Sequence, residues 1–255
     1  MTKKHTGNDP FSSVFEKNNR AKLKSLFQQS NLNSHLGDAL IDNLPLFMNR
    51  QEIMRMIFFK ELYEKILNTH GVVMEFGCRW GKNLSLLTAY RGIYEPYNHN
   101  RKIIGFDTFE GLKGITSTDG DSPFIQEGGY DTTRAHEKYL EEILTCLENE
   151  CPIPNIKKFE IVKGDVRETL PKYLECNPQT VIAFAYFDMD IYEPTKCALE
   201  AILPHVTKGT IIGFDEMNWE TMPGPTLALK EVLGLDRYKV CRSPLQPIPG
   251  WIEIC

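Results

Sequence analysis

The stretch that decides the fold is VIAFAYFDMD, residues 181–190. Its apolar and aromatic residues run without interruption from Val181 to Phe187, and Asp188 and Asp190 follow them. An unbroken apolar run of this length is typical of a strand that is buried on both faces of a parallel sheet. Open α/β sheets bind ligands just beyond the carboxyl ends of such strands. We therefore place this strand at the centre of the sheet and Asp188 at the mouth of a ligand site.

The rest of the chain supplies segments that can surround this strand. Further strands are expected at 71–77, 102–107, 158–165 and 209–216, with helices at 81–90, 132–150, 193–203 and 225–233. This alternation predicts an α/β fold with a doubly wound, mainly parallel sheet. The segments YKVCRS and WIEIC, separated by the proline-rich SPLQPIPG, suit an antiparallel pair at the sheet edge and bring the total to seven strands.

The first 70 residues differ from the rest because their patterns are helical. Helices are expected at 14–29, from Ser34 to Asp42, and at 49–69, whereas residues 1–13 are expected to be frayed. The helix at 49–69 carries a wide apolar stripe and is expected to pack on the sheet edge, with a dimer or lid role as the alternative. That stripe comprises Ile53, Met56, Ile57, Phe59, Leu62, Tyr63, Ile66 and Leu67.

We therefore predict a helical extension at 1–70 and a sheet domain at 71–255. The stretch 108–157 inside that domain contains a long, glycine-rich polar loop. Loops this long in compact domains are usually lids or binding loops.

Composition narrows the class of protein. A hydrophobic content of 42% and a net charge of -5 are ordinary for a globular protein and argue against a nucleic-acid binder. The seven cysteines contain no CxxC pair, so we expect reduced, buried thiols in a cytoplasmic protein. We find no signal peptide and no apolar run approaching the ~20 residues that a membrane span needs.

The turn after the first strand, EFGCRWGKN, is a candidate cofactor turn. Glu75, Gly77 and Gly81 stand at E-x-G-x-x-x-G spacing, and Arg79 occupies the second glycine position of the dinucleotide fingerprint. An acidic residue before the first glycine suits a ligand with a cationic amine, which favours S-adenosylmethionine over a pyrophosphate. The alternative is an ordinary tight turn between strand and helix.

The ends of the next two strands extend this candidate cofactor site. Asp107 ends the second strand, where a carboxylate can accept both ribose hydroxyls, and Thr108 follows it as a further candidate contact. Asp165 ends the third strand and can either contact adenine or cap the following helix.

Three carboxylates follow the fourth and fifth strands. Asp188 ends one, and Asp215 and Glu216 end the other. If these strands are neighbours, the carboxylates converge and repel one another, and a hard divalent cation such as Mg²⁺ or Ca²⁺ resolves that conflict. Alternatively, Glu216 is solvated or caps a helix, and for Asp190 the start of the next helix is the preferred role.

These motifs together resemble the macrocin O-methyltransferase (TylF-like) family. The matching stretches are VVMEFGCRWGKNLS, IIGFDTFEGL, KGDVRETLP, FAYFDMDIYEPT, and GTIIGFDE followed by PGPTLAL. The resemblance implies a Rossmann-like class I methyltransferase that uses S-adenosylmethionine and Mg²⁺ to methylate sugar hydroxyls. It assigns Glu75, Gly77 and Asp107 to the cofactor, and Asp188, Asp215 and Glu216 to the metal. The chain departs from the family where Glu216 replaces an expected aspartate.

We therefore predict in-line methyl transfer to a hydroxyl of a glycosylated natural product or nucleotide sugar, with Asp188 as the base. The insert 108–135 would cover the acceptor, and the apolar helix 49–69 favours a homodimer. Candidate acceptor contacts are Tyr130, Trp219 and Met222. The alternatives are a catechol or phenol O-methyltransferase and a non-catalytic nucleotide-binding protein of the same fold.

Overall fold

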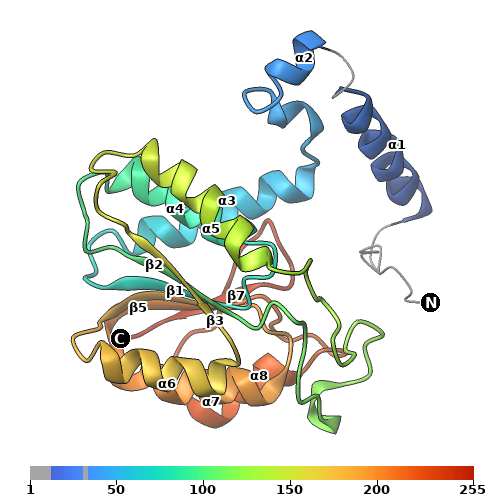
Figure 1. The fold of residues 1–255 in the computed structure, drawn as a ribbon. Coiled ribbons are helices and arrows are strands. Elements are labelled where there is room, and N and C mark those ends of the chain that lie inside the picture. Colours follow the sequence, from blue (N-terminus) through green and yellow to red (C-terminus); the bar gives the residue numbers. More distant parts are fainter. Residues whose placement is uncertain (1–12, 31–33) are drawn as a thin grey trace. The chain divides into compact units, whose positions relative to one another are not determined.

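Figure 1 shows the computed structural model, which describes residues 13–30 and 34–255. Except for Ser13, the positions expected to be frayed lie outside the described residues. The chain forms two compact units, one ending at Met54 and the other running from Arg55 to Cys255. The division falls inside helix α3 (Arg50–Lys65), upstream of the boundary predicted at residue 70.

The first unit is helical, as predicted. It contains α1 (Val14–Ser30), α2 (Ser34–Asp38) and the 3₁₀ helix η1 (Leu44–Phe47). Helix α2 is shorter than expected, since it ends at Asp38 and turns follow it.

The second unit is built on a seven-stranded sheet with the order β3-β2-β1-β4-β5-β7-β6. The neighbouring pairs from β3 to β5 are parallel, while β7 is antiparallel to both β5 and β6. This arrangement confirms the predicted doubly wound sheet with an antiparallel tail. The strands are β1 (Val72–Phe76), β2 (Ile103–Asp107), β3 (Phe159–Lys163), β4 (Ile182–Phe187), β5 (Val206–Phe214), β6 (Cys241–Arg242) and β7 (Gly250–Glu253).

Helices cover both faces of this sheet (Figure 1). One face carries α4 (Lys82–Tyr94), α5 (His136–Asn149) and the part of α3 from Arg55 onward; the other carries α6 (Val166–Cys176), α7 (Tyr192–Ile202) and α8 (Gly224–Val232). Strand β4 lies in the middle, and all its residues are buried, as its unbroken apolar sequence predicts. Its carboxyl end therefore opens at the centre of the sheet, next to the β1–β4 switch point.

Helix α3 packs on a face of the sheet, so the predicted packing on the edge is wrong. The Phe59 ring lies 4.7 Å from Tyr186 of central strand β4, and Phe58 lies 6.1 Å from Trp251 of β7. The buried face of α3 contains Arg55, Phe58, Phe59, Leu62 and Tyr63. It leaves Ile53 and Ile57 exposed although both belong to the predicted stripe.

The predicted insert contains the 3₁₀ helix η2 (Ser117–Asp119) and is tied to the sheet domain by one buried carboxylate. The Asp119 side chain accepts hydrogen bonds from the backbone N–H of Thr116 at 2.7 Å and of Tyr192 at 2.6 Å. The second bond satisfies a free N–H at the start of α7, the role expected for Asp190. Asp190 instead adopts a left-handed backbone conformation with φ +65°, so that expectation is wrong.

The structure bears on two expectations drawn from composition, one about the cysteines and one about membrane-spanning segments. All seven cysteines are unpaired, but only Cys78 is buried, so the expectation of buried thiols is wrong for the other six. Among the described residues, no helix has the length and apolar character needed to cross a membrane.

Candidate active site

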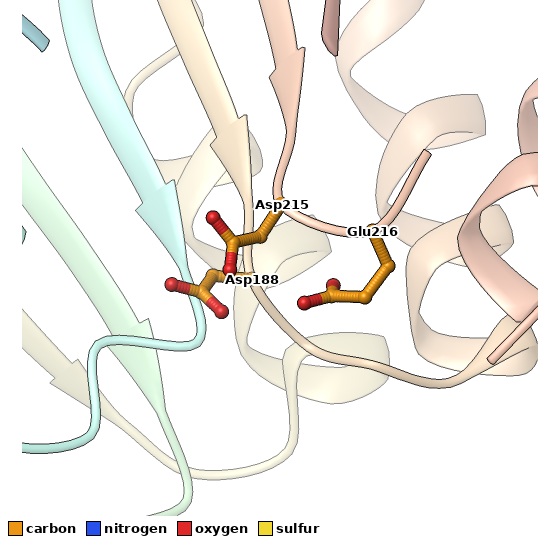
Figure 2. Close-up of side chains that lie close together, drawn as sticks. All are labelled: Asp188, Asp215 and Glu216. Atoms are coloured by element: carbon orange, nitrogen blue, oxygen red, sulfur yellow. The ribbon is translucent and has the colours of Figure 1, made fainter. Parts of the chain in front are cut away.

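The three predicted carboxylates meet where β4 and β5 end. Asp188, Asp215 and Glu216 each offer an oxygen, and these oxygens lie within 4.8 Å of one another. Figure 2 shows the three side chains turned toward a common space. The parallel pairing of β4 with β5 brings them together, since the Asp215 N–H donates to Phe187 O at 2.9 Å.

A network of neutral and cationic donors holds the two aspartates of this acidic cluster. The Arg55 guanidinium forms an ion pair with Asp215 and a second with Asp188 at 3.1 Å. Tyr186 donates its hydroxyl to Asp215 Oδ1 at 2.6 Å, and Asn83 donates to Asp188 Oδ2 at 3.3 Å. Charge-assisted bonds of this kind are strong and directional.

The pKa values of the three carboxyl groups in the acidic cluster are shifted in different directions. Burial, and then the nearby Asp215 charge, raise the pKa of Asp188 well above its usual range. Burial also favours the neutral form of Asp215, but the Arg55 guanidinium and the Tyr186 hydrogen bond outweigh it and lower the Asp215 pKa. Burial and the charge of Asp190 raise the pKa of Glu216. The cluster is therefore an acidic site in which the carboxylates are only partly compensated.

The donor set fits a hard divalent cation. All the converging side chains offer carboxylate oxygens, which Mg²⁺ and Ca²⁺ prefer. In addition, Glu216 Oε2 is buried and has no hydrogen-bond partner among the described residues. An oxygen in that state lacks the compensation that buried polar atoms normally receive.

A pocket of about 560 Å³ opens beside this cluster. It contains four of the six predicted cofactor contacts and also reaches Asp188. The four predicted residues are Gly77, Asp107, Thr108 and Asp165. They lie at or just beyond the carboxyl ends of β1, β2 and β3, so the pocket lies across adjacent strands, where α/β sheets bind nucleotides.

Gly77 joins the pocket to the acidic cluster. Its φ is +93°, and a Cβ at this position would lie 1.9 Å from the carbonyl oxygen of Asp188. Only glycine fits, because a side chain would meet the backbone of the neighbouring strand as well as an unfavourable φ. The turn after β1 therefore lies directly against the backbone of Asp188.

Comparisons with solved structures bear on this arrangement. A crystal structure of CalS11, a calicheamicin methyltransferase, is 39% identical to this chain, with 99% of each chain covered and a TM-score of 0.92. An apo structure of CalS11, described as a TDP-rhamnose 3'-O-methyltransferase of calicheamicin biosynthesis, is 39% identical over 95% of each chain, with a TM-score of 0.82. The chain belongs to the CalS11 methyltransferase family.

More distant comparisons add only the fold. The O-methyltransferase NovP is 15% identical over 79% of this chain and 80% of its own, with a TM-score of 0.59. Neither a protein family model nor a curated protein matches the sequence. Membership of the CalS11 family confirms the predicted enzyme class, an S-adenosylmethionine-dependent O-methyltransferase with a class I fold.

In this CalS11-family protein the remaining cofactor candidates occupy different environments. Asp107 accepts hydrogen bonds from the backbone N–H of Arg79 at 2.7 Å and of Phe109 at 2.5 Å, which fixes its carboxylate at the pocket wall. Asp165 caps α6 by accepting from Arg167 N–H at 3.0 Å and also lines the pocket, so the two alternatives weighed for it are compatible. Its adenine contact stays a prediction.

Glu75 and Gly81 do not line the pocket described above. Glu75 is fully buried and accepts from Asn83 at 2.7 Å, while its second oxygen lacks a partner among the described residues. Burial raises its pKa to about 8 despite the Asn83 bond. Gly81 precedes α4 with φ +82° and lies against Leu140 of α5. Their cofactor roles stay predictions.

The acceptor candidates are similarly divided. Tyr130 lines the pocket, and the Arg79 guanidinium lies 4.7 Å from its ring centroid. Met222 is 1% exposed, so it is packed inside the protein, and Trp219 is half-buried. Neither Trp219 nor Met222 borders this pocket.

Sequence reasoning missed Arg55, Asn83 and Tyr186, which hold the aspartates. The sequence does contain a signal for Arg55. It precedes Phe58 by three residues and Phe59 by four, a spacing that places it on the same buried face of α3. A cation on an apolar helix face needs a buried anionic partner. Tyr186 precedes Asp188 by two residues in β4, but a buried tyrosine alone does not reveal its partner.

Proposed function

We propose that this enzyme transfers a methyl group from S-adenosylmethionine to a sugar hydroxyl, with Mg²⁺ held by Asp188, Asp215 and Glu216. The observation that carries the proposal is the convergence of these three carboxylates beside a pocket at the ends of β1 to β3. The 39% identity to CalS11, a TDP-rhamnose 3'-O-methyltransferase, supports a sugar acceptor. The resemblance to macrocin O-methyltransferases supports the same assignment.

The chain's residues would act mainly by positioning. Gly77, Asp107, Thr108 and Asp165 would hold the donor in the pocket, and Asp188 would face the acceptor from the neighbouring strand. The divalent cation would supply Lewis-acid polarisation of the acceptor hydroxyl. In the reaction the S–CH₃ bond breaks as the O–CH₃ bond forms, and Asp188 takes the hydroxyl proton. Alignment of donor and acceptor would provide much of the rate enhancement.

We include a homodimer and a cytoplasmic location in the proposal. The exposed Ile53 and Ile57 on α3 are suited to an apolar contact between subunits. The unpaired state of all seven cysteines fits a reducing compartment.

An acceptor assay with labelled S-adenosylmethionine tests the function. We expect transfer to TDP-rhamnose or to a rhamnosylated natural product, and none to catechol. Methylation of catechol in preference to both sugars would favour the phenol methyltransferase. Absence of S-adenosylmethionine binding by calorimetry would favour a non-catalytic protein.

A further inference from the structure

Arg55 is the cation that connects the two aspartates of the acidic cluster. Its Nη1 donates to Asp215 Oδ1, its Nη2 to Asp188 Oδ2 at 3.1 Å, and its Nε to Asn83 Oδ1 at 3.3 Å. Asn83 in turn donates to Asp188 Oδ2 at 3.3 Å. Each of the three guanidinium nitrogens therefore has its own acceptor. Two acceptors lie just beyond the ends of β4 and β5, and the third lies in α4.

The surroundings fix the orientation of this guanidinium. The Arg55 side chain is 11% exposed, and its Cζ lies 4.8 Å from the Phe59 ring centroid and 5.3 Å from that of Tyr186. A planar guanidinium held between rings and three acceptors has little freedom to rotate. The guanidinium presents its N–H donors in a fixed, forked arrangement. The ammonium group of lysine lacks this arrangement and cannot form the three bonds together.

The bonds to Arg55 use one oxygen of each aspartate. They engage Oδ2 of Asp188 and Oδ1 of Asp215, and Tyr186 adds a second bond to that same Asp215 oxygen. Arg55 therefore restrains the side-chain torsions of both aspartates from the α3 side. Tyr186 of β4 adds one bond to Asp215, and Asn83 of α4 adds one to Asp188, but of the three only Arg55 bonds to both aspartates.

We propose that Arg55 is a positioning residue that sets the spacing of Asp188 and Asp215 and so makes the site selective for a small divalent cation. The assignment rests on the proposed metal dependence. Mg²⁺ requires near-ideal octahedral oxygens at about 2.0–2.1 Å, whereas Ca²⁺ accepts a looser shell at about 2.3–2.6 Å. A rigid pair of aspartates favours Mg²⁺, and a relaxed pair loses that preference.

The ratio of the two dissociation constants separates geometry from charge. Mg²⁺ and Ca²⁺ carry the same charge, so removal of the Arg55 charge changes both affinities in the same direction and largely cancels in the ratio. A change in ratio therefore reports the spacing of the ligands. Destabilisation of the fold alone would also leave this ratio of dissociation constants unchanged, because it weakens the binding of both ions equally.

The experiment is calorimetric titration of the full chain with MgCl₂ and with CaCl₂. Arg55→Lys keeps the charge and loses the fork, Arg55→Met loses both, and Arg50→Met removes an exposed arginine of the same helix as a control. We expect the preference for Mg²⁺ over Ca²⁺ to fall by about tenfold in both Arg55 variants and to persist in the control. Near-UV circular dichroism establishes that each variant is folded.

The outcomes distinguish this assignment from the proposed function. A wild-type chain that binds neither ion overturns the metal and the role of Arg55 together. A wild-type chain that prefers Mg²⁺, with the same preference in Arg55→Lys, overturns only the role of Arg55. If Arg55→Met does not fold, Arg55→Lys decides the question.

Discussion

Among single residues, Asp188 connects the two parts of the site, since it borders the pocket and belongs to the acidic cluster. We expect Asp188→Ala to lower methyl transfer by about 10²–10⁴-fold, because both the proposed base and a proposed metal ligand are removed. Calorimetry with S-adenosylhomocysteine should show nearly unchanged binding, since the other pocket residues remain. An Asp188→Ala enzyme with the wild-type rate would refute both roles.

Glu75 gives a second prediction at this scale, one that concerns stability. Burial raises its pKa to about 8 from its usual value of 4.5. Between these values the folded protein holds a proton that the unfolded chain releases, so stability is lost as pH rises from 4.5 to about 8, and the loss levels off at higher pH. Glu75→Gln removes this cost and preserves an acceptor for Asn83.

The Glu75→Gln variant should therefore be more stable than the wild type by about 2–4 kcal/mol at pH 9, with a much smaller difference at pH 5. Urea unfolding of the cofactor-free and metal-free proteins at both pH values measures this. A difference that is the same at pH 5 and pH 9 would show that Glu75 is ionised in the folded protein.

Among the structural elements, the predicted lid 108–135 and helix α7 are linked through Asp119. This carboxylate is fully buried and bonds both to Thr116 in the lid and to the first N–H of α7. We expect Asp119→Ala to destabilise the protein by about 1–2 kcal/mol, the usual effect of losing a helix cap. It should also raise the KM for the acceptor, because the lid loses its attachment.

Asp121→Ala is the matched control for this prediction. Asp121 lies two residues further along the same segment and is exposed, so its replacement should change stability by less than about 0.5 kcal/mol. Urea unfolding and steady-state kinetics of the two variants provide the measurements. Equal effects of both substitutions would count against a specific link between lid and helix.

Local patterns predict the elements better than they predict the partners of single side chains. The strands, the alternating helices and the antiparallel tail all follow from periodicity and turn residues. The cap of α7 cannot be predicted from such local patterns, because Asp119 and Tyr192 are 73 residues apart in the sequence. The same holds for Arg55 and Asp215, which are 160 residues apart.

The acidic cluster could be predicted because its members end strands that are neighbours. Its counter-cation comes from a helix whose packing face was expected to meet the sheet edge. The apolar stripe of α3 identifies a helix that must be buried, but Ile53 and Ile57 in that stripe are exposed. The buried face of α3 combines Phe59, Leu62 and Tyr63 of the stripe with Arg55, and only the folded chain shows which acids lie opposite Arg55.

For the whole molecule, the pocket and the acidic cluster predict separable ligand requirements. We expect excess EDTA to abolish methyl transfer and added Mg²⁺ to restore it. S-adenosylhomocysteine should still raise the midpoint of thermal unfolding in EDTA, because a ligand that binds only the folded state stabilises it. Full activity in EDTA would remove the metal from the proposed function and leave the methyltransferase assignment unaffected.

The contact between Gly77 and the backbone of Asp188 also bears on how such an enzyme diversifies. If the proposed function holds, the line along which the methyl group travels is set by the main chains of two adjacent strands, and few side-chain substitutions can alter it. The predicted lid 108–135 is also bonded to α7, through Asp119. New acceptor preferences can then arise by changes at positions of this segment that do not line the donor pocket, which excludes Thr108 and Tyr130. Directed evolution toward other sugars should be concentrated there.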